Sequence, residues 1–115
     1  MKDHERAQHA YERVRAVAAA ERDNYKVAVN ALGPNVVRSG LAATIAFLER
    51  RKDEGAKALR DDLAAAGISG LEGSTAADFG DRIRRLGTKD YMLATREFMR
   101  VALWFKRAVQ ARFGA

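Results

Sequence analysis

The residue types that most often carry catalysis or bind metals are few in this chain, and their spacing suits neither task. There is no cysteine, and the two histidines are His4 and His9. On a helix of 3.6 residues per turn, five positions separate two side chains by about 140°, so these histidines cannot share a face. A zinc site needs three or four converging ligands. We therefore expect both histidines at the surface, no metal site and no cofactor.

Nucleophilic, phosphate-loop and acid–base sites are not indicated either. Ser39, Ser69 and Ser74 fall at helix starts or in a loop, without the G-x-S-x-G pattern that surrounds a nucleophilic serine. The stretch GISGLEGS lacks the lysine and the preceding strand of a phosphate-binding loop. Asp61 and Asp62 are sequence neighbours that would point in different directions from a helix, as solvated carboxylates. The sequence predicts neither an enzyme nor a small-molecule substrate.

Positive charge is the chemistry that remains. The chain has 21 Lys plus Arg against 15 Asp plus Glu, a net charge of +6. This balance favours a polyanion or an acidic protein as partner. Arginine outnumbers lysine, and its planar fork matches phosphate geometry. Arg96, Arg100 and Arg107 recur at spacings of four and seven, so they share one face of a helix, with Leu103 between them.

Apolar residues at spacings of three and four predict helices along the whole chain, and no alternating strand pattern appears. A chain of 115 residues suffices for one core. The expected fold is an all-α, compact single-domain bundle of five or six helices over residues 1–115. No run approaches the ~20 apolar residues that span a bilayer, and the N-terminus is too charged for a signal peptide. We expect a cytoplasmic protein without a membrane partner.

Glycine, proline and capping residues set the expected limits of the first helices. In the first segment the inward residues are expected to include Val14, Tyr11 and Ala18. The second helix is expected over residues 21–32, with Gly33 and Pro34 interrupting it. The third helix is expected to begin after a capping residue, Ser39.

Three further helices are expected in the second half of the chain. A short one covers residues 56–66 and ends at Gly67. Thr75 and Asp78 have the spacing of a capping box before the next helix, which Gly87 ends. Thr88 is expected to cap the last helix.

The long C-terminal helix mixes aromatic and basic residues, and helical periodicity separates them. One broad inward face is predicted because its members follow each other at three and four. Its members are Tyr91, Thr95, Phe98, Ala102, Phe105 and Val109. We therefore expect most of these aromatics to be core rather than platforms for bases. Leu103 lies among the arginines, and we interpret it as a protein contact.

Three stretches resemble one known family, the small all-helical subunit of the type III-B CRISPR effector, the Cmr complex. The first two are SGLAATIAFLERR from residue 39 and YKVAVNALGP from residue 25. The third consists of Tyr91, Thr95 and Glu97, followed by WFKRAVQA from residue 104. The similarity covers roughly residues 6–51 and 88–113. It departs from the family at Gly33, which separates Leu32 from Pro34, and at Phe105, where leucine is usual. Residues 54–87 show no such resemblance.

The resemblance implies a non-enzymatic subunit that stacks with copies of itself and helps to hold guide RNA and target RNA. Its other partners would be the backbone and large subunits of the Cmr effector. By motif, Lys106 and Arg107 carry over as basic positions, and Arg50 and Arg51 lie beside a matched helix. Face geometry adds three further candidates for contacts with nucleic acid. They are Arg38, Arg96 and Arg100.

Two alternatives follow from the same charge. A small basic helical DNA-binding regulator would need polar residues near the start of a recognition helix to read base edges. LAATIAFL offers almost none, so base-specific reading is disfavoured. The other alternative is a helical adaptor that binds only proteins.

Overall fold

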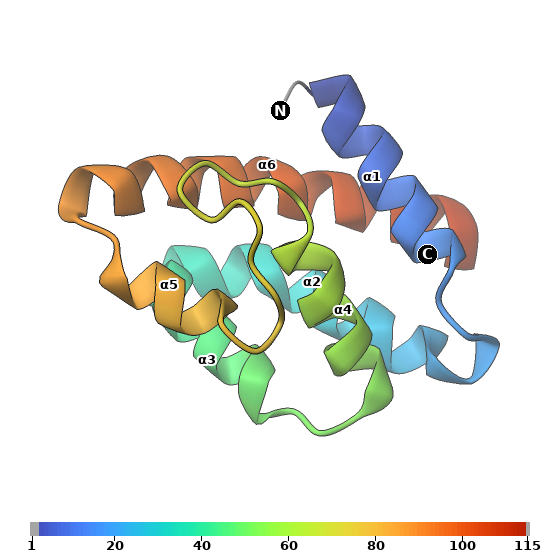
Figure 1. The fold of residues 1–115 in the computed structure, drawn as a ribbon. Helices are drawn as coiled ribbons and strands as arrows, with labels where there is room; N and C mark the ends of the chain where they lie inside the picture. The colour runs from blue at the N-terminus through green and yellow to red at the C-terminus, as the bar shows by residue number, and fades with distance from the viewer. Residues whose placement is uncertain (1–2, 115) are drawn as a thin grey trace.

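The long C-terminal helix α6 (Thr88–Phe113) is the element on which α1 and α2 pack. The structure is a computed structural model that describes residues 3–114. Within that range the chain forms six α-helices and no strand, which confirms the predicted all-α bundle with a long last helix (Figure 1). The helices before α6 are α1 (Asp3–Arg15), α2 (Arg22–Ser39), α3 (Leu41–Arg50), α4 (Glu54–Ala64) and α5 (Phe79–Arg85), with a short 3₁₀ turn over Ala19–Glu21.

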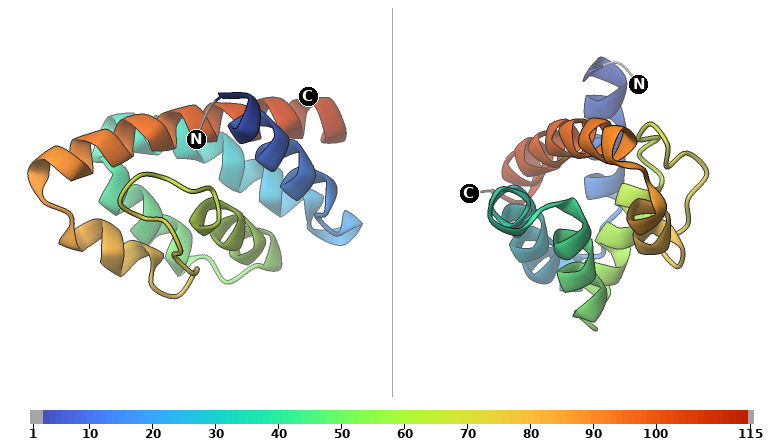
Figure 2. Two further views of the ribbon diagram at one scale, coloured as in Figure 1. Left: turned by 45° about the horizontal axis from the view of Figure 1, so that its top comes forward. Right: turned by 90° about the vertical axis from the view of Figure 1, so that its left-hand side faces the viewer.

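The inward face of α6 is the one that its sequence predicts. Phe98 and Phe105 are fully buried, and Ala102 and Val109 are buried beside them, while Tyr91 and Thr95 are half-buried. α1 leans across the C-terminal half of α6, and α2 runs alongside α6 (Figure 2). α2 and α6 are antiparallel, because Tyr25 near the start of α2 meets the ring of Phe113 at 6.3 Å.

The expected break at Pro34 is wrong, since α2 continues through this residue to Ser39. An interior proline removes one helical hydrogen bond and costs about 3 kcal/mol. The packing of α2 opposes that cost. Leu32 and Val36 are four residues apart and both buried, so a continuous helix keeps both in the core. Tertiary burial therefore overrides the local signal.

The expected caps of α3 and α6 are also wrong. Ser39 is the last residue of α2, and Thr88 is the first residue of α6 without a capping hydrogen bond from a side chain. Gly40 joins α2 to α3 with φ of +89°, a conformation that glycine adopts readily. The cap of α3 comes from a distant residue, because the hydroxyl of Tyr91 accepts a hydrogen bond from the amide of Ala42 at 2.9 Å.

The segment between α3 and α6 completes the bundle. Asp53 caps α4 by accepting from the amide of Ala56 at 2.8 Å, so α4 begins two residues earlier than expected. The predicted capping box is confirmed: Thr75 N donates to Asp78 Oδ1 at 2.8 Å, and Asp78 N donates to Thr75 Oγ1 at 3.3 Å. In the first helix, Val14 is buried as predicted, but Tyr11 and Ala18 are exposed.

Candidate nucleic-acid interface

The outer face of α6 carries a row of basic side chains. Arg96, Arg100 and Arg107 are exposed, on the side opposite the buried Phe98 and Phe105. Lys89 lies seven residues before Arg96 and extends the row. Lys89 and Arg107 are 18 positions apart, or about 27 Å at a rise of 1.5 Å per residue. We call Lys89, Arg96, Arg100 and Arg107 the α6 basic row. Its sequence signal is the same spacing of seven that relates Arg100 to Arg107.

The members of the row differ in how they are held. Arg107 stacks over the ring of Trp104, with the guanidinium carbon 4.8 Å from the ring centre. Arg100 lies 3.4 Å from the carboxylate of Asp3, and both side chains are more than half exposed. Within residues 3–114, no carboxylate forms an ion pair with Arg96. Such exposed cations remain available to an anionic partner, because a surface ion pair contributes little.

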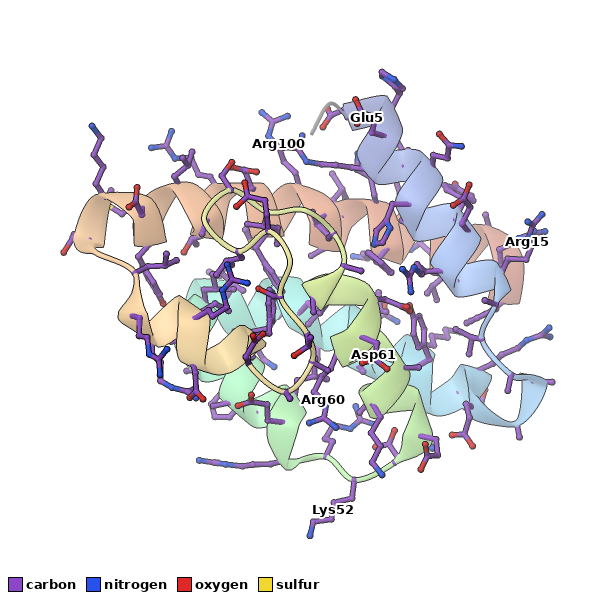
Figure 3. The ribbon with its side chains drawn as sticks, viewed as in Figure 1. Glu5, Arg15, Lys52, Arg60, Asp61 and Arg100 are labelled. Atoms are coloured by element: carbon purple, nitrogen blue, oxygen red, sulfur yellow. The ribbon has the colours of Figure 1, made fainter. Side chains whose placement is uncertain are left out.

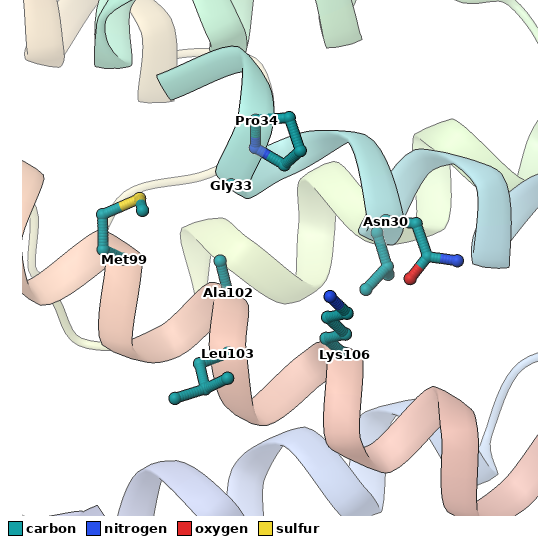
Figure 4. A pocket seen from close by; sticks show the side chains of 8 residues that line it. Asn30, Gly33, Pro34, Met99, Ala102, Leu103 and Lys106 are labelled. Atoms are coloured by element: carbon teal, nitrogen blue, oxygen red, sulfur yellow. The ribbon is translucent and has the colours of Figure 1, made fainter. Parts of the chain in front are cut away.

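Lys106 is exposed but lies on a different side of α6, toward α2. It lines a groove between the two helices together with Met99 and Leu103 (Figure 4). Leu103 is 45% exposed, so it is a surface residue and not part of the core. Its interpretation as a protein contact stays a prediction.

The remaining predicted residues are not part of the α6 row. Arg50 stacks over Phe47 at 5.8 Å at the end of α3. Arg51 is half-buried and donates to Asp53 at 3.0 Å and to the carbonyl of Asn24 at 3.5 Å, so it ties the end of α3 to α4 and α2. Lys52 next to it and Arg100 lie on opposite sides of the molecule (Figure 3). Arg38 is exposed near the end of α2.

Two groups whose pKa is raised, Tyr25 and Asp62, lie inside the bundle and not on this surface. The Tyr25 hydroxyl donates to Asp62 Oδ2 at 2.6 Å, and Arg13 reaches Asp62 Oδ1 at 3.4 Å. Burial raises the pKa of Tyr25 well above its usual range, and the neighbouring Asp62 carboxylate raises it further. Burial also raises the pKa of Asp62, although its hydrogen bond from Tyr25 and the charge of Arg13 oppose this.

This buried cluster corrects two expectations. Asp62 is 7% exposed and is not a solvated carboxylate. His9 is half-buried rather than a surface residue: its Nε2 lies 2.9 Å from the Asp62 carbonyl oxygen, and its ring meets Phe105 edge-on at 5.9 Å. The spacing of residues along the sequence could not reveal the burial of Asp62 or of His9, because their contacts join α1 to α4 across 49 or more residues. The cluster joins α1, α2 and α4.

The fold and this surface define a small, basic, all-helical protein with a charged outer face on its longest helix. Among residues 3–114 no group of three metal-ligating side chains converges, and no helix is long and apolar enough to cross a membrane.

Comparisons with known proteins identify the assembly. Residues 2–112 match the family model described as CRISPR-associated protein (Cas_Cmr5). The CRISPR system Cmr subunit Cmr5 of Thermus thermophilus is 36% identical over 107 residues, which cover 91% of this chain and 90% of that protein. The X-ray crystal structure of a CRISPR-associated Cmr5 family protein from the same organism superposes with a TM-score of 0.85 at 34% identity, and the match covers 96% of both chains.

The chain therefore belongs to the Cmr5 family of CRISPR-associated proteins, as a subunit of the Cmr complex. The resemblance found in its sequence is confirmed. The family match also spans residues 54–87, where the sequence motifs showed no resemblance. The alternative of a DNA-binding regulator finds no support in these comparisons.

Proposed function

We propose that this chain is a non-catalytic small subunit of a type III-B, RNA-guided effector in antiviral defence. It stacks with copies of itself and contacts guide RNA and target RNA, while the backbone and large subunits of the complex are its protein partners. It uses no cofactor or small-molecule substrate and acts in the cytoplasm. The observation that carries the RNA role is the α6 basic row, which places four exposed cations on one side of a single helix.

The chemistry of the row suits phosphates rather than bases. Contacts to phosphate position a protein on a nucleic acid without reading its sequence. Sequence-tolerant base binding uses exposed aromatic rings, and Phe98 and Phe105 of α6 are fully buried, so neither ring can stack on a base. The basic residues outside the row, Arg38, Arg50, Arg51 and Lys106, are proposed as further contacts to RNA or to neighbouring subunits.

The test measures how RNA binding depends on salt. The test variant carries both Arg96→Glu and Arg107→Glu. The control is a second double variant, Arg15→Glu with Lys57→Glu, which changes the net charge by the same amount at exposed positions on α1 and α4. Affinity for single-stranded RNA is measured between low and high salt, for the free chain and for the reconstituted complex. If two phosphate contacts are lost, the slope of log affinity against log salt should become shallower by about 1.4 only in the α6 variant.

The opposite result would point to the adaptor that binds only proteins. In that case the α6 variant would weaken assembly of the complex and leave both the RNA affinity and its salt slope at wild-type values. Weak binding by the free chain alone would not decide the matter, because affinity can arise from several linked copies.

A further inference from the structure

A groove between α2 and α6 lies beside the α6 basic row and has different chemistry. It is about 170 Å³ in volume. Gly33 and Pro34 contribute to its wall from α2, while Met99, Ala102 and Lys106 point toward α2 from α6 (Figure 4). Within the part of the chain that the structure describes, nothing fills this space. A cavity of about 150 Å³ can hold a benzene ring, so the groove can take one apolar side chain.

The lining favours a peptide over RNA. None of the lining residues is aromatic, so an unpaired base would find no ring on which to stack. Lys106 is the one charged residue of the lining, which is too few for a run of phosphates. Met99 supplies an unbranched, adaptable side chain, a type that recurs at protein-binding surfaces.

Pro34 gives the groove a polar feature as well. It has no N–H, so the carbonyl of Asn30, four residues earlier, lacks its usual helical donor. Asn30 lines the groove. Its carbonyl can therefore accept a hydrogen bond from a backbone N–H of an extended segment laid along α2.

The charges around the groove indicate what kind of segment would bind. Arg38 lies one turn after Pro34 on α2, and Lys106 follows Leu103 by about one turn on α6. The nearest carboxylate on the same stripe of α2 is Asp23, two turns before Asn30. The surface is thus positive, and Val37, on the same stripe as Gly33, is 80% exposed. A second copy of this chain, with net charge +6, is a poor complement to it.

We propose that the α2–α6 groove docks an acidic segment of a different protein subunit. One apolar side chain of that segment enters between α2 and α6, and its carboxylates face Lys106 and Arg38. The proposal rests on the proposed role as a complex subunit, but not on RNA contacts by the α6 basic row.

The first test fills the groove or reverses its charge in the reconstituted complex. A Cβ at Gly33 would have no atom within 4 Å, and the residue is helical, so Gly33→Leu can enter the groove without backbone strain. Gly33→Ala is its matched control, and Lys106→Arg is the control for Lys106→Glu. The apparent affinity of the chain for the other purified subunits should fall at least tenfold for Gly33→Leu and Lys106→Glu. Both controls should stay within twofold of wild type, and so should RNA affinity of the free Gly33→Leu variant.

Wild-type assembly by both test variants would overturn the proposal. The second test identifies the occupant by placing a photo-crosslinking amino acid at position 37 of the chain in the complex. Crosslinks to a segment rich in Asp or Glu of another subunit are expected. Crosslinks mainly to RNA, or to a second copy of this chain, would contradict the proposed occupant. Because the RNA-binding test uses Arg96 and Arg107 in the free chain, either proposal can fail while the other stands.

Discussion

At the scale of single residues, the pair of Tyr25 and Asp62 holds three helices together. Tyr25 is fully buried on α2, Asp62 lies on α4, and Arg13 approaches Asp62 from α1. A buried carboxylate is costly unless hydrogen-bond donors surround it. The hydrogen bond from the Tyr25 hydroxyl is shorter than the contact from Arg13 to the same carboxylate. The sequence could not identify this pair, since tyrosine and aspartate 37 residues apart follow no helical period.

Replacing Tyr25 by phenylalanine should therefore destabilise the fold. The variant keeps the ring and removes only the hydroxyl, which leaves Asp62 with one fewer donor. A hydrogen bond to a charged group contributes about 1.5–3 kcal/mol, so the free energy of unfolding in urea should fall by that amount. Tyr11→Phe is the control, because Tyr11 is exposed. Equal unfolding midpoints for the two variants would show that the hydroxyl contributes nothing.

At the scale of helices, packing decides what local signals leave open. Helix existence and inward faces followed from apolar spacing, as Phe98 and Phe105 show on α6. The ends of several helices did not follow from apolar spacing or from local capping signals. Pro34 is a strong local signal for an end, but the burial of Leu32 and Val36 outweighs it. Similarly, the cap of α3 comes from Tyr91, which no local pattern around Ser39 could indicate.

Gly55 on α4 and Gly33 on α2 differ in how much space surrounds them, and replacing each by alanine tests how closely a neighbouring helix approaches. A Cβ at Gly55 of α4 would lie 2.7 Å from the backbone nitrogen of Tyr25, so α4 and α2 are in direct backbone contact there. Gly55→Ala should lower the free energy of unfolding by about 1–3 kcal/mol, because the two helices must move apart. Gly33→Ala meets open space and should instead raise it by about 0.5–1 kcal/mol. Urea denaturation measures both, and a stabilising Gly55→Ala would contradict the packing argument.

At the scale of the whole molecule, the seven predicted contact residues do not form one surface. Periodicity within α6 correctly grouped Arg96, Arg100 and Arg107, because one helix fixes their relative directions. It could not place Arg50 and Arg51, which depend on how α3 packs, and Arg51 proves to be half-buried between α2 and α4. A subunit with basic groups on two sides and an apolar groove on a third can contact several neighbours in an assembly.

Leu103 separates folding from assembly in such a subunit. It is 45% exposed at the edge of the α2–α6 groove, whereas Leu93 is 44% exposed on the same helix, about 80° further round and ten residues earlier. Both Leu103→Asp and Leu93→Asp should unfold within about 0.5 kcal/mol of wild type, as surface substitutions do. Only Leu103→Asp should reduce incorporation into the reconstituted Cmr complex, because its carboxylate would face the acidic segment that we place in the groove. Native mass spectrometry of the complex, with each variant in competition with wild type, measures incorporation directly. Equal incorporation of both variants would remove Leu103 from the interface. A loss of stability confined to Leu103→Asp would show that Leu103 contributes to folding and would contradict its interpretation as a residue of assembly alone.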